Sequence, residues 1–582
     1  MSYLLILQTE RGIALIAAIF MVVVFGFLGL VVVSLVGTQG FSTMNDLKSD
    51  QALFIAEGGM ERAILQFRGG TSCAGLTNAV PTALGAGSFT IVGQLFRPIS
   101  TLINQGGGIN NNVTTIPVDS TAGYASHGRI RIDTEWIDYT GITATSFTGA
   151  RRASGGSAAA AHADNAPVAQ SQCLIRSTGT VTSPAGNTQR VVERAIPMGV
   201  SVQTGTANAT ADGTFTVNIP SAVVPARSFL IFNARHNSNR PVGSYIRGRI
   251  ASATTLEFVR VTDEGPGMPP INIRWYVVEY DSGVSVQRGE TTQSATTINL
   301  RAAQGFAGVA AINRAFVTWS KTPTDTDVAY SFNDPIIGEI TATNNLQFRV
   351  DTAAATHIIW WQVIEYTNGA ITVQDGTTTF PNNVLTRTLV PATPLNAANS
   401  FVLVGYRTSD GPLDVGARML RAQINAGNVV IDRSIDSGTG GDQDITEAHW
   451  QAVSFGDGSL VQGGSENFPA NDPQEIVALA TPVDPDRSVA FASVQPVSGQ
   501  SMGRSPMIGS DAQDVDIIGI GSVTMALTGA PMANQITMDR NAFNPPFNPA
   551  SASTDIGWFV VQFAAGTQPG SIPPIDWIEV FP

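Results

Sequence analysis

Charge is scarce in this chain of 582 residues: only 13% of them are charged, and neither sign forms runs. The formal net charge of −13 is therefore spread thinly along the sequence. A surface that binds nucleic acid needs clustered Lys and Arg, so the composition argues against nucleic acid as a partner. Low charge together with abundant Gly and Thr is typical of a secreted β-rich protein.

Histidine is also rare, with five residues that share no common position in the repeats described below. No Ser/His/Asp set, paired carboxylates, HExxH sequence or phosphate-binding glycine loop at a helix start is evident. We therefore expect neither enzymatic activity nor a cofactor. His162 stands in an Ala/Gly-rich stretch, where a lone histidine is most often an exposed loop residue.

The two cysteines, Cys73 and Cys173, are too few for a disulfide scaffold or a zinc site. They can form one bridge in an oxidising compartment, or they can be two buried free thiols. In the chain-entropy model a bridge across this loop contributes about 4–5 kcal/mol.

Long apolar runs are confined to the N-terminus, where Ile13–Gly37 carries no charge and the first acidic residue after it is Asp46. This run is long enough to cross a bilayer as a helix. After it, apolar residues recur at helical spacing and predict an amphipathic continuation to Phe67: Leu53, Ala56, Met60, Ile64 and Phe67. The pair Gly58-Gly59 is a candidate soft point in this helix. A plain signal anchor is the alternative interpretation.

Glu10-Arg11-Gly12 directly precedes Ile13-Ala14-Leu15-Ile16-Ala17, and Ala56–Glu61 follows the apolar run. This combination resembles the type IV prepilin family, above all minor pilins of the PilX and mannose-sensitive-hemagglutinin kinds. The resemblance implies that a prepilin peptidase cuts between Gly12 and Ile13 and that Ile13 becomes an N-methylated end. It further implies a precursor in the inner membrane, other pilins as partners, and a final place in an extracellular pilus.

Ala17 departs from the family pattern, because major pilins carry a glutamate at the fifth mature position. That carboxylate is thought to pair with the terminal amine of a neighbouring subunit, since an unpaired charge in hydrocarbon is costly. Its loss favours a position at or near the filament tip, although the family branch can instead simply tolerate Ala here.

The expected fold is α+β at the N-terminus: residues 13–204 form a pilin module with a long helix (13–67) and a small antiparallel sheet. Strands are expected at 88–92, 173–181 and 190–196. A glycine-rich β insertion at about 110–170 looks like a small module of phage-tail and bacterial surface proteins. Residues 1–12 form the leader.

The remaining chain repeats at roughly 85–110 residues, the length of one β-sandwich domain. Four all-β sandwich domains are expected at 205–290, 291–378, 379–465 and 466–582. Each contains a signature strand: Trp275–Tyr280, Trp361–Tyr366, Trp450–Phe455 and Trp558–Phe563. In the first three, a tight turn and a Val-Gln strand follow and predict a hairpin. A Trp strand after a strand with Arg resembles H-type lectin domains; some antiparallel sandwich is the broader expectation.

Three sets of residues are candidate sites. Trp275, Trp361, Trp450 and Trp558 are either sugar-stacking platforms or core residues. The arginines at repeated positions can contact a ligand or pair with nearby acids such as Glu279 and Glu365: Arg260, Arg349, Arg433 and Arg540. Asp436, Asp442 and Asp444 offer oxygen ligands for calcium, or they line a solvated turn.

The sequence thus predicts a minor pilus subunit whose β repeats adhere to a surface, glycan or protein, with its position at the tip or in the shaft left open. The alternative is a structural subunit for pilus assembly or priming, or a pseudopilin of a secretion system, with the β array as a spacer or docking surface.

Overall fold

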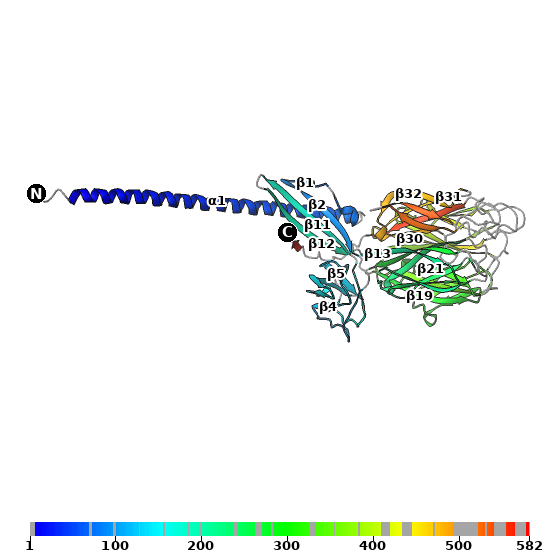
Figure 1. The fold of residues 1–582 in the computed structure, drawn as a ribbon. Helices are drawn as coiled ribbons and strands as arrows, with labels where there is room; N and C mark the ends of the chain where they lie inside the picture. The colour runs from blue at the N-terminus through cyan, green and yellow to red at the C-terminus, as the bar shows by residue number, and fades with distance from the viewer. Residues whose placement is uncertain are drawn as a thin grey trace.

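The computed structural model describes residues 6–580 apart from short gaps of one to four residues and the following longer ones: 237–242, 262–269, 325–332, 409–419, 434–444, 494–521, 541–553 and 565–577. It contains one long helix, a sheet packed on that helix, a small β domain and four β-sandwich repeats (Figure 1). The predicted order of an N-terminal helix before antiparallel sandwich-like sheets is confirmed.

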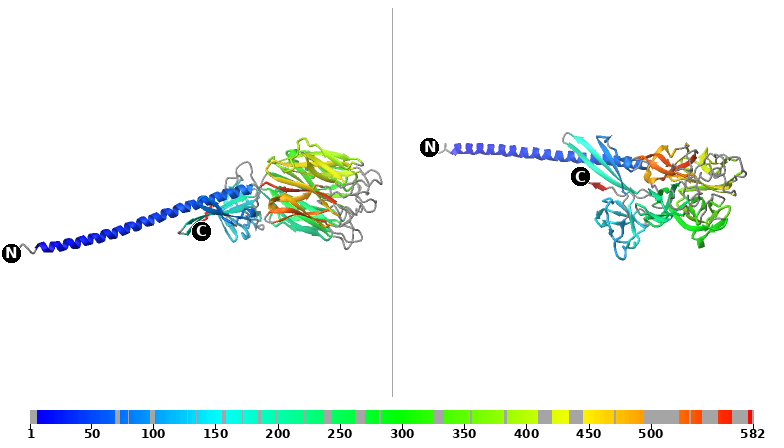
Figure 2. Two further views of the ribbon diagram at one scale, coloured as in Figure 1. Left: turned by 90° about the horizontal axis from the view of Figure 1, so that it is seen from above. Right: turned by 45° about the vertical axis from the view of Figure 1, so that its right-hand side comes forward.

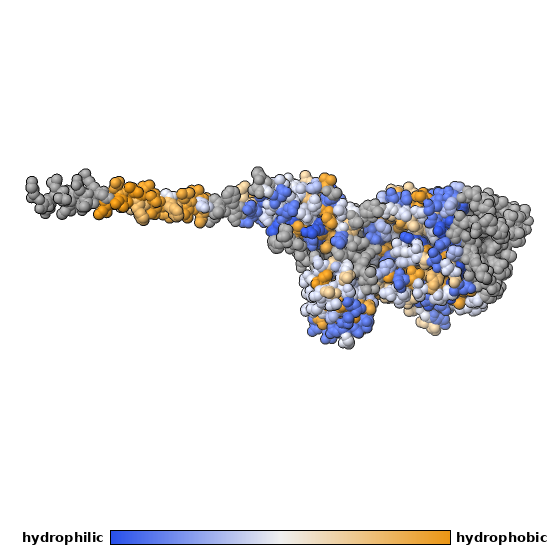
Figure 3. Space-filling view, viewed as in Figure 1, coloured by the Kyte–Doolittle hydropathy of each residue, from blue (hydrophilic) through white to orange (hydrophobic). Residues whose placement is uncertain are grey.

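The helix α1 (Ile6–Arg68) contains 63 residues and so spans about 95 Å. None of its segment Ile13–Val36 is buried, and this exposed apolar length is the orange part of the helix in Figure 3. The C-terminal part instead buries one face, which includes Ala56, Met60 and Phe67. The predicted amphipathic continuation is confirmed.

A five-stranded antiparallel sheet covers this buried face of α1, in the order β1-β2-β11-β12-β37. Its strands are β1 (Thr82–Leu84), β2 (Gly87–Phe96), β11 (Gln172–Ser183), β12 (Gly186–Pro197) and β37 (Ile578–Val580). The three strands expected here are confirmed as β2, β11 and β12. The assignment of residues 466–582 to one repeat is wrong at its end, because β37 pairs with β12.

Glycines let the helix and the sheet approach closely. A Cβ at Gly179 would lie 2.1 Å from the carbonyl oxygen of Ala52, and one at Gly59 would lie 2.3 Å from Ser177 Oγ. The helix is continuous through Gly58-Gly59. The pair is therefore not a soft point: at Gly59 the missing side chain makes room for the sheet.

The small β domain is inserted between β2 and β11. Its strands are β3 (Thr101–Leu102), β4 (Thr115–Pro117), β5 (Gly128–Ile132), β6 (Glu135–Tyr139), β7 (Gly141–Thr143), β8 (Ser146–Thr148), β9 (Arg151–Ser154) and β10 (Pro167–Ala169). They form the sheets β3-β10-β5-β6-β9 and β4-β8-β7 around a core of their own. Figure 1 shows this domain beside the sheet, on the side of the four repeats.

Each repeat consists of two three-stranded antiparallel sheets. Repeat 1 pairs β13-β18-β15 and β14-β17-β16; repeat 2 β19-β24-β21 and β20-β23-β22; repeat 3 β25-β30-β27 and β26-β29-β28; repeat 4 β31-β36-β33 and β32-β35-β34. The outer strands of the first sheets are β13 (Val200–Ala209), β15 (Ser228–Arg235), β19 (Val284–Gln293), β21 (Ala315–Pro323), β25 (Ile371–Phe380), β27 (Ser400–Thr408), β31 (Leu460–Phe468) and β33 (Ser488–Ala492). Their central strands are β18 (Ile271–Tyr280), β24 (His357–Tyr366), β30 (Ile445–Phe455) and β36 (Thr554–Gln562).

The second sheets have a matching layout. Their outer strands are β14 (Gly213–Asn218), β16 (Ile246–Ile250), β20 (Thr297–Leu300), β22 (Ile337–Ala342), β26 (Thr386–Leu389), β28 (Leu420–Asn425), β32 (Gln474–Val483) and β34 (Thr524–Thr528). Their central strands are β17 (Thr255–Arg260), β23 (Asn345–Arg349), β29 (Asn428–Arg433) and β35 (Ala533–Asp539). Short 3-10 turns, such as η2 (Pro225–Arg227) and η5 (Pro485–Arg487), precede β15 and β33.

The hairpin predicted after each of the first three signature strands is wrong. β18 pairs with β13 and β15, whereas the following β19 pairs with β24 of the next repeat. The tight turn therefore joins two repeats. For the same reason the repeats begin with β13, β19, β25 and β31, five to eight residues before the predicted boundaries.

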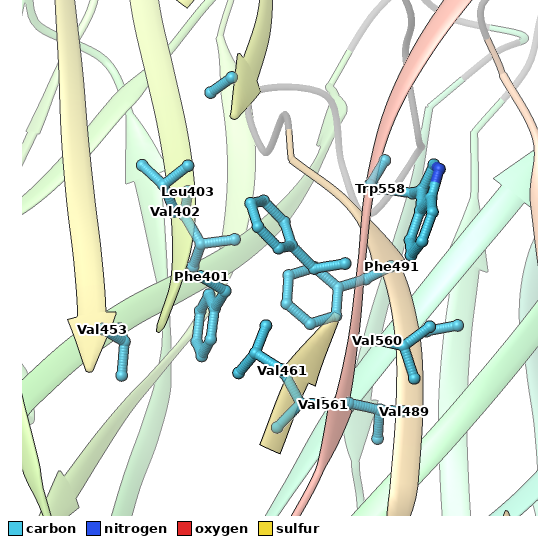
Figure 4. Packing of buried hydrophobic residues seen from close by; sticks show 14 of the residues in the cluster. Phe401, Val402, Leu403, Val453, Val461, Val489, Phe491, Trp558, Val560 and Val561 are labelled. Atoms are coloured by element: carbon cyan, nitrogen blue, oxygen red, sulfur yellow. The ribbon is translucent and has the colours of Figure 1, made fainter. Parts of the chain in front are cut away.

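The four repeats pack side by side into one β-rich body (Figure 2). They close into a ring around a shared aromatic core. The residues at the ends of the four signature strands form a cycle, with centroid distances of 5.3 Å for Tyr280–Tyr366, 6.2 Å for Tyr366–Phe455, 6.1 Å for Phe455–Phe563 and 5.7 Å for Phe563–Tyr280. Next to this cycle Phe401 and Phe491 meet edge to face at 5.2 Å (Figure 4). The sandwiches are thus one unit rather than an extended array.

Amide side chains join neighbouring repeats. Gln362 of repeat 2 accepts from the amide of Leu230 in repeat 1 at 3.1 Å and donates to the carbonyl of the same residue. Gln451 of repeat 3 makes the same pair of bonds with Val317 of repeat 2, at 3.1 and 3.3 Å. Each glutamine therefore satisfies the outward backbone groups of an edge strand.

Candidate functional site

The four signature tryptophans belong to the cores of their own repeats. Their exposed fractions are 2% for Trp275, 2% for Trp361, 5% for Trp450 and 8% for Trp558. Each indole lies over a glycine directly across the sheet, where a Cβ would come within 2.4–2.8 Å of Cζ2. These pairs are Gly205↔Trp275, Gly289↔Trp361, Gly376↔Trp450 and Gly464↔Trp558. The four tryptophans are therefore core residues, and they offer no open ring face to a sugar.

Three of the four repeated arginines are equivalent and structural. Arg260, Arg433 and Arg540 are buried and donate to backbone carbonyls, for example from Arg260 to Ala209 O at 3.1 Å. Arg349 lies one residue earlier in its strand and instead pairs with two carboxylates. Arg349 thus shows the expected pairing with local acids, but its partners are Glu339 and Glu447 rather than Glu279 or Glu365. Glu279 accepts from the amide of Val224 and pairs with Arg131 of the small domain, and Glu365 accepts from the amides of Ala310 and Ala311.

A cavity of about 350 Å³ opens between repeats 1 and 2 and reaches repeat 4. Strands β15 and β16 of repeat 1 form one wall, and β19, β21 and β24 of repeat 2 form the other. Its polar lining includes Asn233, Arg249, Arg288, Ser320 and Gln362. A cavity of this size, mixed apolar and hydrogen-bonding, is of the kind that holds a small ligand.

Trp360 and two arginines form one side of this cavity and its surroundings. The guanidinium carbons of Arg249 and Arg247 lie 4.2 and 4.9 Å from the centroid of the Trp360 ring, which favours a cation–π contact. Trp360 Nε1 donates to Glu290 at 2.6 Å, and Arg249 pairs with Glu257 at 2.9 Å. The ring is thus covered by arginine, so hydrogen bonds rather than stacking on Trp360 would hold a ligand.

Arg288 is the most strongly desolvated cation of the cavity wall. It donates to the carbonyls of Pro225 and Ser228 at 2.7 and 2.5 Å, and burial lowers its pKa to about 10. It remains charged at neutral pH. Together with Arg249 it gives the cavity a positive side that suits hydroxyl or anionic groups.

His162 is the centre of a buried polar cluster that sequence reasoning missed. Its exposed fraction is 4%, and its ring nitrogens lie 2.7 Å from Asp133 Oδ2 and 2.8 Å from Glu135 Oε2. Glu135 also accepts from Arg152 at 2.7 Å. The expectation of an exposed loop residue is wrong, because the loop folds back over the strand β6. The available sequence signal for this cluster was the pair of acids Asp133 and Glu135, which lie two residues apart.

Burial alone raises the pKa of the Glu135 carboxyl, but hydrogen bonds outweigh it. Arg152, the amides of Ala160 and Ala153, and His162 together lower this pKa from 4.5 to about 2. The carboxylate is therefore the charged hub of the small domain. Its partners are all used in folding contacts, which gives the cluster a structural role.

Cys73 and Cys173 form the expected disulfide, with Cα atoms 5.7 Å apart. Ala17 lies in the exposed apolar part of α1, and Ile13 begins that part. Gly12 lies in the helix as well, but its burial is not among the described features. The calcium candidates Asp436, Asp442 and Asp444 also lie outside the described residues.

Comparisons with known proteins show no family for this chain. No family model matches the chain, and no curated protein matches it. Among solved structures, the Faustovirus major capsid protein aligns over 89% of this chain and 97% of its own, at 9% identity and a TM-score of 0.08. A likeness this weak carries no argument. The class that the fold defines is a long-helix protein with two β insertions, one of which is a closed ring of sandwiches.

Proposed function

We propose that this chain is a minor subunit of a type IV pilus-like filament and that its β ring mediates adhesion. The observation that carries the first part is the helix segment Ile13–Val36, which is 24 residues long and wholly unburied. Such a surface needs lipid before assembly and neighbouring helices afterwards. The disulfide fits an oxidising compartment outside the cytoplasm.

The residues around Gly12 support the prepilin interpretation. α1 continues without a break from the leader into the apolar segment, so a cut after Gly12 would leave the whole segment on the mature chain. Ala17 places no carboxylate in that segment, which favours a tip-proximal subunit. The mature end at Ile13 would then be N-methylated.

The ring supports adhesion through its position and its cavity. It lies at the opposite end of the molecule from the helix N-terminus (Figure 1). The cavity beside Arg249 and Arg288 offers several hydrogen-bond donors at a junction of two repeats. A glycan or another polyhydroxylated surface group is the ligand class that this lining suits, and the H-type lectin resemblance agrees with it.

Processing is tested by N-terminal mass spectrometry of the chain recovered from sheared filaments. We expect it to start at Ile13. Gly12→Val should leave a longer precursor in the inner membrane, because the apolar helix still inserts. Gly26→Val is the matched control, since a Cβ there meets nothing within 4 Å. A chain that starts beyond residue 37 would exclude the pilin proposal.

Adhesion is tested by replacing residues 200–563 with a short Gly/Ser linker. This design keeps β37, whereas a truncation near residue 200 would also remove a strand of the helix-associated sheet. Filaments that persist without attaching support adhesion, and loss of filaments supports the alternative of an assembly subunit. Arg249→Ala should weaken binding on a glycan array, while Arg387→Ala in repeat 3, which donates to the Thr379 carbonyl, serves as the control.

The alternative of a spacer or docking surface has one observation in its favour. The ring contacts the rest of the chain through buried groups: Arg487 lies 5.9 Å from the Phe67 ring of α1, and Arg131 of the small domain pairs with Glu279. A firmly attached ring suits a structural role as well. Normal attachment by the ring-deleted filament would favour this alternative.

A further inference from the structure

Three potential metal ligands meet at the junction of repeats 2 and 3. Glu339 comes from β22 of repeat 2, and Asp375 and His449 come from β25 and β30 of repeat 3. His449 Nε2 lies 3.9 Å from Glu339 Oε1 and 3.7 Å from Asp375 Oδ2. One donor atom from each residue falls within 4.8 Å of the others.

The burial of His449 is a second observation, besides the cluster of three donors, that points to a ligand. Its exposed fraction is 2%, and its Nε2 has no hydrogen-bond partner among the described residues. The two carboxylate oxygens are too far for hydrogen bonds, yet they face this nitrogen. A buried polar atom without a partner carries a free-energy cost, which an ion bound between the three donors would remove.

A neighbouring arginine, Arg349, holds one of the two carboxylates. Arg349 donates to Glu339 Oε2 at 2.5 Å, which turns Oε1 towards His449. Arg349 also pairs with Glu447 at 2.9 Å, and Glu447 in turn pairs with Arg407 at 2.9 Å. Such outer contacts fix ligand geometry in metal sites.

The corresponding places at other junctions have different chemistry. Between repeats 1 and 2 they hold Arg249 and Trp360 in cation–π contact. Between repeats 3 and 4, Arg421 pairs with Asp432 at 2.8 Å and lies 3.8 Å from Asp555. Among the described residues, a set of three possible metal ligands is found at the junction of repeats 2 and 3.

We propose that Glu339, Asp375 and His449 bind one divalent transition metal of the zinc type, which joins repeats 2 and 3. Zinc accepts one imidazole nitrogen with carboxylate oxygens at about 2.0–2.2 Å. Two donors at that distance and a tetrahedral angle are about 3.4 Å apart. The distances from His449 Nε2 to the Asp375 and Glu339 oxygens, 3.7 and 3.9 Å, need to close by only a few tenths of an ångström.

Access and selectivity follow from the same residues. The Asp375 side chain is 44% exposed, so an ion can enter and water can complete the coordination. Calcium prefers six to eight oxygen ligands, which this nitrogen-containing set does not provide. Binding should therefore favour Zn²⁺ over Ca²⁺.

The test uses the untagged full chain in detergent, stripped with a chelator and then titrated with Zn²⁺. One Zn²⁺ per chain is expected, and His449→Gln and Asp375→Asn should each weaken binding by more than about tenfold, since even outer contacts are worth that much. Asp212→Asn, an exposed turn residue of repeat 1, is the charge-matched control and should leave the affinity unchanged. Co²⁺ substitution should give ligand-field bands that disappear in His449→Gln.

Absence of Zn²⁺ binding, or binding that neither variant weakens, would overturn the proposal. Circular dichroism checks that each variant is folded. Asp375→Asn changes a partly exposed side chain and should fold normally, so it decides the matter if His449→Gln does not fold. Zn²⁺ retained by Asp375→Asn with full affinity would place the ion elsewhere and count against this site.

Discussion

Replacing Gln451 by methionine should test whether the repeats are held together by amide contacts. The change keeps the length of the side chain but removes both bonds to Val317, whose backbone lies on the outer edge of β21. Val317 is 0% exposed, so water cannot replace the lost partners. Each orphaned buried group costs about 1–3 kcal/mol, which predicts a loss of about 2–6 kcal/mol in the free energy of unfolding.

Gln374→Met is a matched control for this prediction. Gln374 makes the same two bonds with the backbone of Thr393, at 2.8 and 2.9 Å, but at an exposed site. Water can satisfy Thr393 after the change, so we expect a loss below about 1 kcal/mol. Urea denaturation gives both values, and hydrogen exchange should show faster opening at the Val317 amide only in Gln451→Met. Equal losses for the two variants would refute the reasoning.

Three further changes test separate parts of the fold. Reducing the bond between Cys73 and Cys173 should cost about 4–5 kcal/mol by loop entropy, measured by denaturation with and without reductant; a double serine variant that ignores reductant is the control. Gly376→Ala should destabilise repeat 3 by about 1–3 kcal/mol, because its Cβ would meet the indole of Trp450 at 2.8 Å; an unchanged melting temperature would contradict this. The depressed pKa of Glu135 contributes stability that is complete above pH 4.5 and is lost as pH falls towards 2, so Glu135→Gln should flatten the acid limb of the stability curve.

The features that the sequence predicted correctly depend on local periodicity. Helical spacing identified the buried stripe of α1, and strand alternation placed Trp275 and the terminal Tyr280 on opposite faces of β18, one in the core of the repeat and one in the shared core. The repeat itself was visible because all four copies keep the signature strand. Local patterns of this kind need no knowledge of distant partners.

Ring closure could not be predicted in this way. It depends on contacts such as Tyr276 Oη with the carbonyl of Met525, 249 residues apart, at 2.7 Å. Nothing in the sequence around a tyrosine in a strand predicts which distant backbone group its hydroxyl will contact. The hairpin error has the same origin, since a turn followed by a strand looks alike whether the strands pair with each other or belong to neighbouring sandwiches. The set of Glu339, Asp375 and His449 was missed because its members lie far apart in sequence, on three strands of two repeats.

The placement of the disulfide gives these observations a common mechanical meaning. Cys173 pairs in register with Leu95 and Ile196, one residue from the ends of β2 and β12 where the two insertions leave the sheet. The bond to Cys73 therefore ties the chain just after α1 to the base of both the small domain and the ring. Without this bond, the covalent path from Cys173 back to Cys73 would run through a chain separation of 100 residues, which includes the small domain. Under the adhesive function proposed above, the covalent link lies at the point where such a load enters the helix-associated sheet.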